Sequence, residues 1–223
     1  ALQRPVLLAH RGAHDAMLQE NSLAALVAGA QQCDGVEFDV RFSADGKYLA
    51  LLARPAEAKQ LADLKKKGFK AEVYEEDLIN TQLWLAQLQQ LDAGLGQRIP
   101  TLWQVLQLLA PTPLWLNIEL KGDNTVGPLL PLLERAEREL QFDVNRLLIS
   151  SFNHHLLAAL KQQQPALKLG ALTASLPIDY AAFAHQLQAY SVHCDVSFIN
   201  QAFVDDAKAR GLKVYVYTVD QAD

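Results

Sequence analysis

Short β-type runs alternate along this chain with longer stretches of helical periodicity, and this alternation limits the possible folds more than any other feature of the sequence. Strands are expected at residues 6–9, 35–41, 114–120, 147–151, 167–172, 192–199 and 213–219. Helices are expected at residues 22–32, 102–110, 126–140, 156–163, 180–189 and 202–210. Successive strands joined through helices need crossover connections, so the pattern predicts an α/β fold with a parallel sheet and helices outside it.

One region interrupts the alternation. Turn residues at 43–47 join the strand at 35–41 to a β-type run at 48–52, which predicts a hairpin. From about 54 to 98 no strand is evident, and a cluster of lysines precedes a cluster of acids, as is typical of an inserted, solvated and partly helical segment. We therefore expect one domain over residues 1–223 with an insertion at about 54–98.

Charge and hydropathy exclude two classes of protein. The 223 residues carry a formal net charge of −5 with no basic stripe, so nucleic acid is not an expected partner. No run approaches the roughly 18 consecutive apolar residues of a membrane-spanning helix, so no membrane span is expected.

Cys33 and Cys194 form no C-x-x-C motif and are predicted to be buried thiols of a reducing compartment. This favours the cytoplasm, with cleavage of a leader before Ala1 as the alternative, and no feature indicates an oligomeric state.

Three acidic residues fall within apolar strands. Glu37 and Asp39 are two positions apart, so strand geometry places both side chains on one face. Glu119 lies in the apolar strand at 114–120, where an unpaired carboxylate would be costly. A hard divalent cation, Mg²⁺ or Ca²⁺, would satisfy all three acids. The alternative is a set of separate salt bridges to the basic residues Lys121, Arg41 or Arg146.

The first expected strand ends in His10-Arg11-Gly12. Open α/β folds bind ligands at the carboxyl ends of their strands, so these residues form a plausible phosphate site. The Arg11 guanidinium matches phosphate oxygens in a bidentate fork, and a histidine is the commonest acid or base near neutral pH. The alternative is that the segment turns the chain and pairs with an acid.

Eight short motifs together resemble a known family. In chain order they are His10-Arg11-Gly12, Glu20-Asn21-Ser22, Glu37-Phe38-Asp39-Val40, Asp45-Gly46, Ile99-Pro100-Thr101-Leu102, Ile118-Glu119-Leu120-Lys121, Ser150-Ser151-Phe152 and Tyr217-Thr218-Val219-Asp220. Their order and spacing resemble those of the glycerophosphodiester phosphodiesterases along nearly the whole chain. The resemblance implies a TIM-type (β/α)8 barrel and hydrolysis of a small-molecule glycerophosphodiester to glycerol 3-phosphate and an alcohol.

The resemblance also implies roles for individual residues. The acids Glu37, Asp39 and Glu119 would bind the divalent cation at the mouth of the barrel. His10 would be one of two acid/base groups, and Arg11 and Lys121 would hold phosphate oxygens. These groups are all present in the sequence.

The chain departs from the family at the second histidine. The family's His-Asp pair after the Asp-Gly turn is replaced by Leu52 and Ala53, neither of which can move a proton. We therefore expect an impaired or specialised enzyme, with His14 as a candidate substitute acid/base. The other histidines are not placed in the site: His154 and His155 are expected to begin a solvent-facing helix, and His185 and His193 to be structural or exposed.

Two further departures concern the end of the chain. Tyr217 stands where the family usually has tryptophan, which changes an aromatic wall near the expected glycerol position. The family usually continues with a helix and the closing strand of the barrel, so we expect the natural chain to extend beyond Asp223. An intact mass of 24.7 kDa would contradict this expectation.

Two other functions compete with hydrolysis. A catalytically inactive relative could bind a phosphodiester as a sensor or regulatory module, as the loss of the second histidine suggests. Schiff-base chemistry at Lys121 is a third possibility, which the neighbouring Glu119 and the metal-type acids disfavour. The sequence distinguishes neither the alcohol of the substrate nor Mg²⁺ from Ca²⁺.

Overall fold

The structure is a computed structural model that describes residues 8–10, 34–42, 49–51, 100–122 and 125–217. The helix expected at 22–32 and the insertion expected at about 54–98 lie outside these residues, so the predicted insertion stays a prediction. The chain falls into two compact units, Ala1–Arg146 and Leu147–Asp223. Each unit is described by itself.

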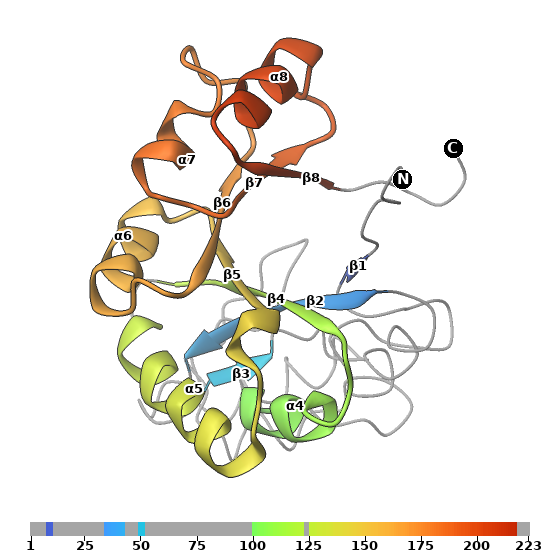
Figure 1. Cartoon of the computed structure of the whole chain (residues 1–223), viewed down its shortest axis with the longest axis vertical. Helices are drawn as coiled ribbons and strands as arrows, with labels where there is room; N and C mark the ends of the chain where they lie inside the picture. Colours follow the sequence, from blue (N-terminus) through green and yellow to red (C-terminus); the bar gives the residue numbers. More distant parts are fainter. Residues whose placement is uncertain (1–7, 11–33, 43–48, 52–99, 123–124, 218–223) are drawn as a thin grey trace, which may run out of the picture. The chain divides into compact units, whose positions relative to one another are not determined.

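The first unit is built around strand β2, Gly35–Phe42. It pairs in parallel with β1, Leu8–His10, and with β4, Trp115–Leu120 (Figure 1). It also pairs antiparallel with β3, Leu49–Leu51, and Val40 is opposite Leu51. The hairpin expected from the turn residues is therefore confirmed.

Strands β2 and β4 each have one apolar and one polar face. The apolar face carries side chains with at most 2% of their surface exposed, namely Val36, Phe38, Val40, Leu116, Ile118 and Leu120. This period of two leaves the intervening positions, including Glu37 and Asp39, on the opposite face. The acids are therefore held on a sheet whose other side is anchored in the core.

Two helices lie side by side on one side of this sheet (Figure 1). Helix α4, Leu102–Leu109, begins with a capping box in which Thr101 and Gln104 exchange side-chain to backbone hydrogen bonds. Helix α5, Val126–Leu140, buries Leu129 and Leu133 and ends at a left-handed residue, followed by the 3-10 turn η1, Val144–Arg146. These helices correspond to the expected ones at 102–110 and 126–140.

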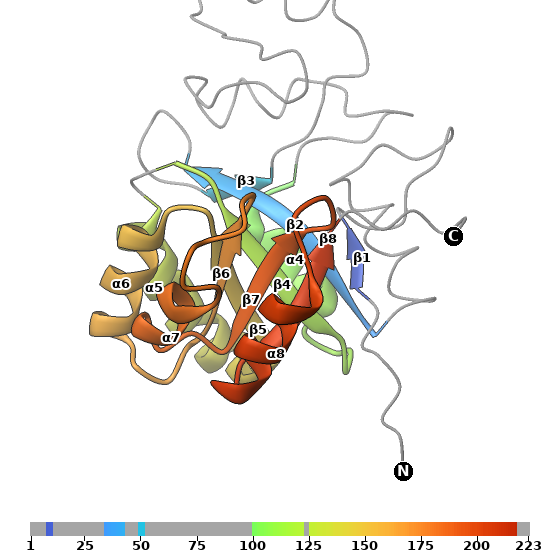
Figure 2. The ribbon, with the colours of Figure 1, turned by 90° about the horizontal axis from the view of Figure 1, so that it is seen from above.

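The second unit continues the alternation of strands and helices. Its elements are β5 Leu147–Ser151, α6 His154–Gln163, β6 Lys168–Thr173, α7 Ala182–Gln186, β7 Ser191–Asp195, α8 Gln201–Ala209 and β8 Lys213–Tyr217. The four strands pair in parallel in chain order, and the three helices lie on one side of them (Figures 1 and 2). The predicted α/β class with parallel strands is confirmed in both units.

Two elements of this unit are shorter than expected. The strand expected at 192–199 ends at Asp195, because the Asp195 carboxylate accepts a hydrogen bond from the Ser197 amide and turns the chain. The helix expected at 180–189 is confined to Ala182–Gln186. Positive φ angles of 48° at Tyr180 and 53° at Gln188 interrupt the helical backbone on both sides.

Among the helices of the described ranges, none could span a lipid bilayer.

Candidate metal centre

The register of β2 and β4 brings the three predicted acids together. Asp39 is the direct neighbour of Glu119 across the two strands, and Glu37 is two positions before Asp39 on the same face. Each of the three residues offers one carboxylate oxygen, and these oxygens all lie within 4.8 Å of one another. All three side chains are buried, with exposed fractions of 8% for Glu37, 0% for Asp39 and 8% for Glu119.

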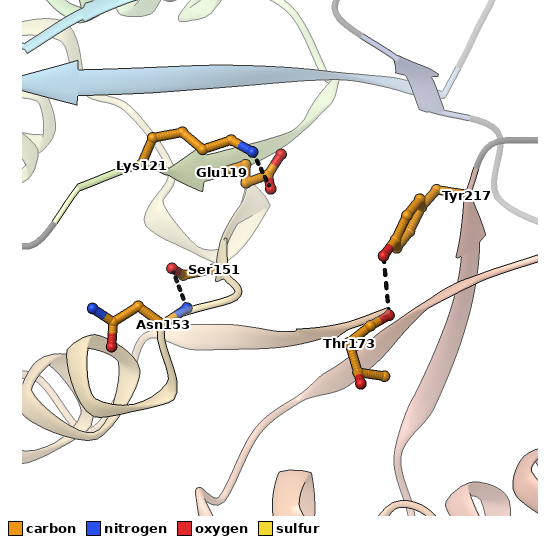
Figure 3. Close-up of polar contacts among 6 residues, drawn as sticks. All are labelled: Glu119, Lys121, Ser151, Asn153, Thr173 and Tyr217. Atoms are coloured by element: carbon orange, nitrogen blue, oxygen red, sulfur yellow. Dashed lines mark hydrogen bonds and ion pairs between the residues drawn. The ribbon is translucent and has the colours of Figure 1, made fainter. Parts of the chain in front are cut away.

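Burial and mutual repulsion change the protonation of this cluster. The pKa of the Glu119 carboxyl is raised to about 8, chiefly by burial and further by the neighbouring Asp39 carboxylate. The ammonium of Lys121, with its Nζ atom 3.1 Å from Glu119 Oε1, opposes this shift (Figure 3). Without a further positive charge, the cluster therefore holds a proton near neutral pH.

The donor set fits a hard divalent cation. Three buried carboxylates supply oxygen ligands of the type that Mg²⁺ and Ca²⁺ prefer. The raised pKa of Glu119 shows that the positive charge of Lys121 does not balance the negative charge of the cluster. A cation at this point would supply further positive charge. The residues present are therefore chemically suited to hold such an ion.

The basic residues that the sequence offered as salt-bridge partners make different contacts. Lys121 pairs with Glu119, and its backbone amide donates to the Val40 carbonyl, which fixes it just beyond the end of β4. Arg146 instead donates from Nη2 to the Leu109 carbonyl and stacks over the Phe142 ring at 4.4 Å. Of the salt bridges expected as the alternative, the one between Lys121 and Glu119 is present, and it lies beside the acid cluster.

The ion pair also bears on Schiff-base chemistry. It uses the ammonium form of Lys121, which has no lone pair to attack a carbonyl carbon. The geometry therefore gives no support to the aldolase-like alternative.

His10 lies on the strand next to the acids. It is the register partner of Glu37 in the parallel pairing of β1 with β2. Arg11 and His14, and the replaced positions Leu52 and Ala53, lie outside the described residues. The catalytic roles predicted for His10, Arg11 and His14 therefore stay predictions.

Sequence reasoning overlooked one residue on the polar face. Asn117 is the register partner of Glu37 and lies two positions before Glu119, with 5% of its surface exposed. A polar residue at an alternate position of an apolar strand was the available signal, because it must share the face of Glu119.

The other histidines have structural contacts. His154 is half-buried rather than solvent-facing: its Nε2 donates to the Leu172 carbonyl at 2.8 Å and its ring stacks on Phe183. His193 is buried, hydrogen-bonded to the Ser191 hydroxyl at 2.8 Å, and stacked on Tyr215. The expectation that His154 faces solvent is wrong, because the start of α6 packs against α7.

The two remaining histidines are exposed. His155 begins the outer side of α6, and His185 lies on α7. The expectation for His185 and His193 as exposed or structural is confirmed.

Two other residues noted in the sequence lie in the second unit. The Tyr217 hydroxyl donates to the Thr173 carbonyl at 3.0 Å, and its ring meets Phe152 edge to face (Figure 3). Cys194 is a buried free thiol whose pKa burial raises to about 12, so it is not reactive at neutral pH. Cys33 lies outside the described residues.

Comparison with known proteins identifies the family. The sequence model of the glycerophosphoryl diester phosphodiesterase family matches residues 10–223. The chain belongs to this family. A relative named glycerophosphodiester phosphodiesterase, from Caldanaerobacter subterraneus subsp. tengcongensis, is 30% identical over 99% of this chain and 88% of its own length.

Solved structures show the fold of the chain. A phosphodiesterase from Oleispira antarctica, in complex with the product sn-glycerol-3-phosphate, is 27% identical with a TM-score of 0.78, covering 97% of this chain and 85% of that one. A glycerophosphodiester phosphodiesterase from Agrobacterium tumefaciens is 21% identical with a TM-score of 0.70, covering 98% and 89%. The predicted TIM-type barrel class is thereby confirmed for this member of the glycerophosphoryl diester phosphodiesterase family.

Proposed function

We propose that this protein is a metal-dependent hydrolase that cleaves glycerophosphodiesters to glycerol 3-phosphate and an alcohol. The observation that carries the proposal is the convergence of three buried carboxylates within 4.8 Å in a member of this family. The bound sn-glycerol-3-phosphate of the Oleispira antarctica relative supports a ligand of the same chemistry here. A cytoplasmic location accompanies the proposal as a prediction.

Glu37, Asp39 and Glu119 would hold the divalent cation, which is Mg²⁺ or Ca²⁺. When bound, such an ion supplies positive charge that stabilises the phosphoryl oxygens as the diester bond breaks. Lys121 is 26% exposed at the end of β4, so its ammonium can contact a phosphate oxygen while remaining near Glu119. Arg11 would bind another phosphate oxygen through its guanidinium.

The groups for proton transfer differ from the family pattern. His10 would act as one acid/base group, but the second position of the family pattern is occupied by Leu52 and Ala53. Loss of one such group typically costs about 10²- to 10⁴-fold in rate. We infer that turnover of natural diesters is slow or specialised, with His14 as the substitute proton donor.

The alternative is a catalytically inactive relative that binds a phosphodiester as a sensor. The absence of any histidine from residues 48–57 favours it. It keeps the same cation and phosphate ligands, so binding alone does not separate the two functions.

Release of glycerol 3-phosphate from a panel of glycerophosphodiesters tests the proposal. The assay is run with Mg²⁺, with Ca²⁺ and with EDTA, on the unchanged protein and on Glu119→Gln and His14→Ala. We expect cation-dependent turnover that Glu119→Gln abolishes, and a further loss with His14→Ala if this residue is the substitute acid.

Two other outcomes would contradict different parts of the proposal. Turnover that persists in EDTA would contradict the metal centre. No turnover, with cation-dependent protection against thermal unfolding by the same diesters, would establish the sensor function instead.

A further inference from the structure

We propose that Asn117 is a positioning residue of the metal centre, whose side-chain amide holds the Glu37 carboxylate in place. The inference rests on the proposed function, because it assumes that the three acids bind a cation. It starts from the register of two strands, which places Asn117 directly beside Glu37.

The polar face of β2 and β4 is arranged in successive rows across the two strands. Glu37 and Asn117 form one row, and Asp39 and Glu119 form the next row toward the carboxyl ends. Neighbouring residues on the same face of a parallel sheet have side chains within contact distance of each other. Asn117 is thus the cross-strand neighbour of Glu37 and lies two positions before Glu119 on the same strand.

Because Glu37 is buried, its carboxylate needs a hydrogen-bond donor from the protein. Asn117 and Glu37 have exposed fractions of only 5% and 8%. A buried ionised carboxylate can only accept hydrogen bonds, and leaving it without donors is costly. The Asn117 amide offers two N–H donors beside the Glu37 carboxylate. A hydrogen bond between them would offset the cost of burying each of the two groups.

The neutrality of asparagine suits a cation site. A lysine or arginine at position 117 would also donate to Glu37, but its charge would repel a divalent ion among the acids. A neutral amide orients the carboxylate and leaves the negative charge of the cluster for the cation.

Glu119 and Glu37 would then be oriented by different partners. Lys121 pairs with Glu119 at 3.1 Å beyond the end of β4, where the ammonium is partly exposed. Asn117 would hold Glu37 in the interior, where a charged donor would be costly. The charged donor, Lys121, thus lies where the phosphate is proposed to bind, and the neutral donor, Asn117, lies in the interior.

Calorimetric titration of the full chain with Mg²⁺ and with Ca²⁺ tests the proposal. Asn117→Leu has nearly the same shape but no donor, and we expect it to weaken cation binding by about 10- to 100-fold. At saturating cation it should recover most of the kcat of the unchanged protein, because Asn117 acts only through the position of Glu37.

Ser191→Ala serves as the matched control. It removes a buried hydrogen bond to His193 in the other unit, so it should lower the melting temperature without changing cation affinity. If Asn117→Leu does not fold, Asn117→Ser keeps a polar side chain but withdraws the donor from Glu37, and it should also weaken cation binding.

The outcomes separate this inference from the proposed function. Unchanged cation affinity in a folded Asn117 variant, with normal binding by the unchanged protein, would overturn the role of Asn117 alone. A weakening shared equally by Ser191→Ala would overturn it as well, since general destabilisation would then explain the loss. No cation binding by the unchanged protein would overturn the metal centre itself.

Discussion

At the scale of single residues, the acid cluster is chemically suited to bind a cation but lowers the stability of the folded state without one. Glu119 is buried beside Asp39, and its pKa is raised to about 8 as a result. Three carboxylates this close repel one another unless a proton or a cation intervenes. The residues that would bind a cation therefore disfavour the folded state when no cation is present.

Glu119→Gln tests this conflict through stability. In EDTA we expect the free energy of unfolding to stay equal or to rise, because the neutral amide replaces a carboxyl that must otherwise take up a proton near neutral pH, and it still accepts from Lys121. With cation at about 100 times its dissociation constant, the unchanged protein should gain about 2.7 kcal/mol, and the variant should gain little. Denaturant unfolding with and without Mg²⁺ or Ca²⁺ measures both quantities.

The exposed Glu137 on α5 provides the control. Glu137→Gln makes the same chemical change outside the cluster and should keep the full response to the cation. A strong loss of stability by Glu119→Gln in EDTA would show that Glu119 stabilises the metal-free fold.

His193 predicts a loss of stability in acid. Burial lowers its pKa to about 3, whereas an unfolded histidine titrates near 6.5. Between these values the unfolded chain binds a proton that the folded chain does not, so His193 makes stability fall as pH drops below about 6.5. The slope from this single group reaches about 1.4 kcal/mol per pH unit at most.

Urea unfolding between pH 7 and pH 4 checks this prediction. His193→Gln cannot titrate and should show a shallower decline than the unchanged protein, whereas exposed His185→Gln should not. The imidazole contacts the Ser191 hydroxyl and the Tyr215 ring, neither of which carries a charge in this range. Equal slopes for all three proteins would show that His193 is hydrated or protonated in the folded state.

At the scale of elements, local side-chain to backbone bonds decide where helices begin. Asn200 accepts from the Phe203 amide at 2.9 Å and starts α8, and Asn153 accepts from the Leu156 amide and starts α6. Such caps satisfy amides that have no partner within the helix. Helix α7 has no such side-chain cap at Ala181, and its start differs from the expected one.

Asn200→Ala should remove the cap of α8. We expect a loss of about 1 kcal/mol in the free energy of unfolding, because the Phe203 amide loses its acceptor. Asn200→Asp keeps an acceptor oxygen and should retain nearly full stability. Thermal or urea unfolding measures the difference, and equal losses in both variants would argue against capping as the cause.

At the scale of the whole molecule, all three acids of the candidate centre belong to the first compact unit. Ligand binding to the folded state lowers the population of opened states in the elements that hold the ligand. The second unit supplies none of these acids, although its strands pair in parallel in the same way.

Hydrogen exchange should therefore respond unevenly to the cation. We expect Mg²⁺ or Ca²⁺ to slow amide exchange in β2 and β4 more than in β6 and β7. Mass-spectrometric exchange with and without EDTA measures this, and Glu119→Gln should remove the difference. Equal protection of both units would mean that they open together as one cooperative body.

The alternation of strands and helices and the shared face of Glu37 and Asp39 could be predicted from the amino-acid order alone, because both follow from local periodicity. The order of the sequence motifs also determined the family. Helix α7 and the end of β7 were predicted less well, since positive φ angles and an aspartate turn depend on contacts that periodicity does not express.

The identity of the strand beside β2, in contrast, depends on the three-dimensional fold. The pairing with β4 sets Glu119 next to Asp39 and Asn117 next to Glu37, although long stretches of chain separate the two strands. Register between distant strands is set by packing of the apolar face, where Val36, Phe38 and Ile118 are fully buried. The proximity of the acids, the raised pKa of Glu119 and the place of Asn117 all follow from that packing, because desolvation and charge repulsion act through space and not along the chain.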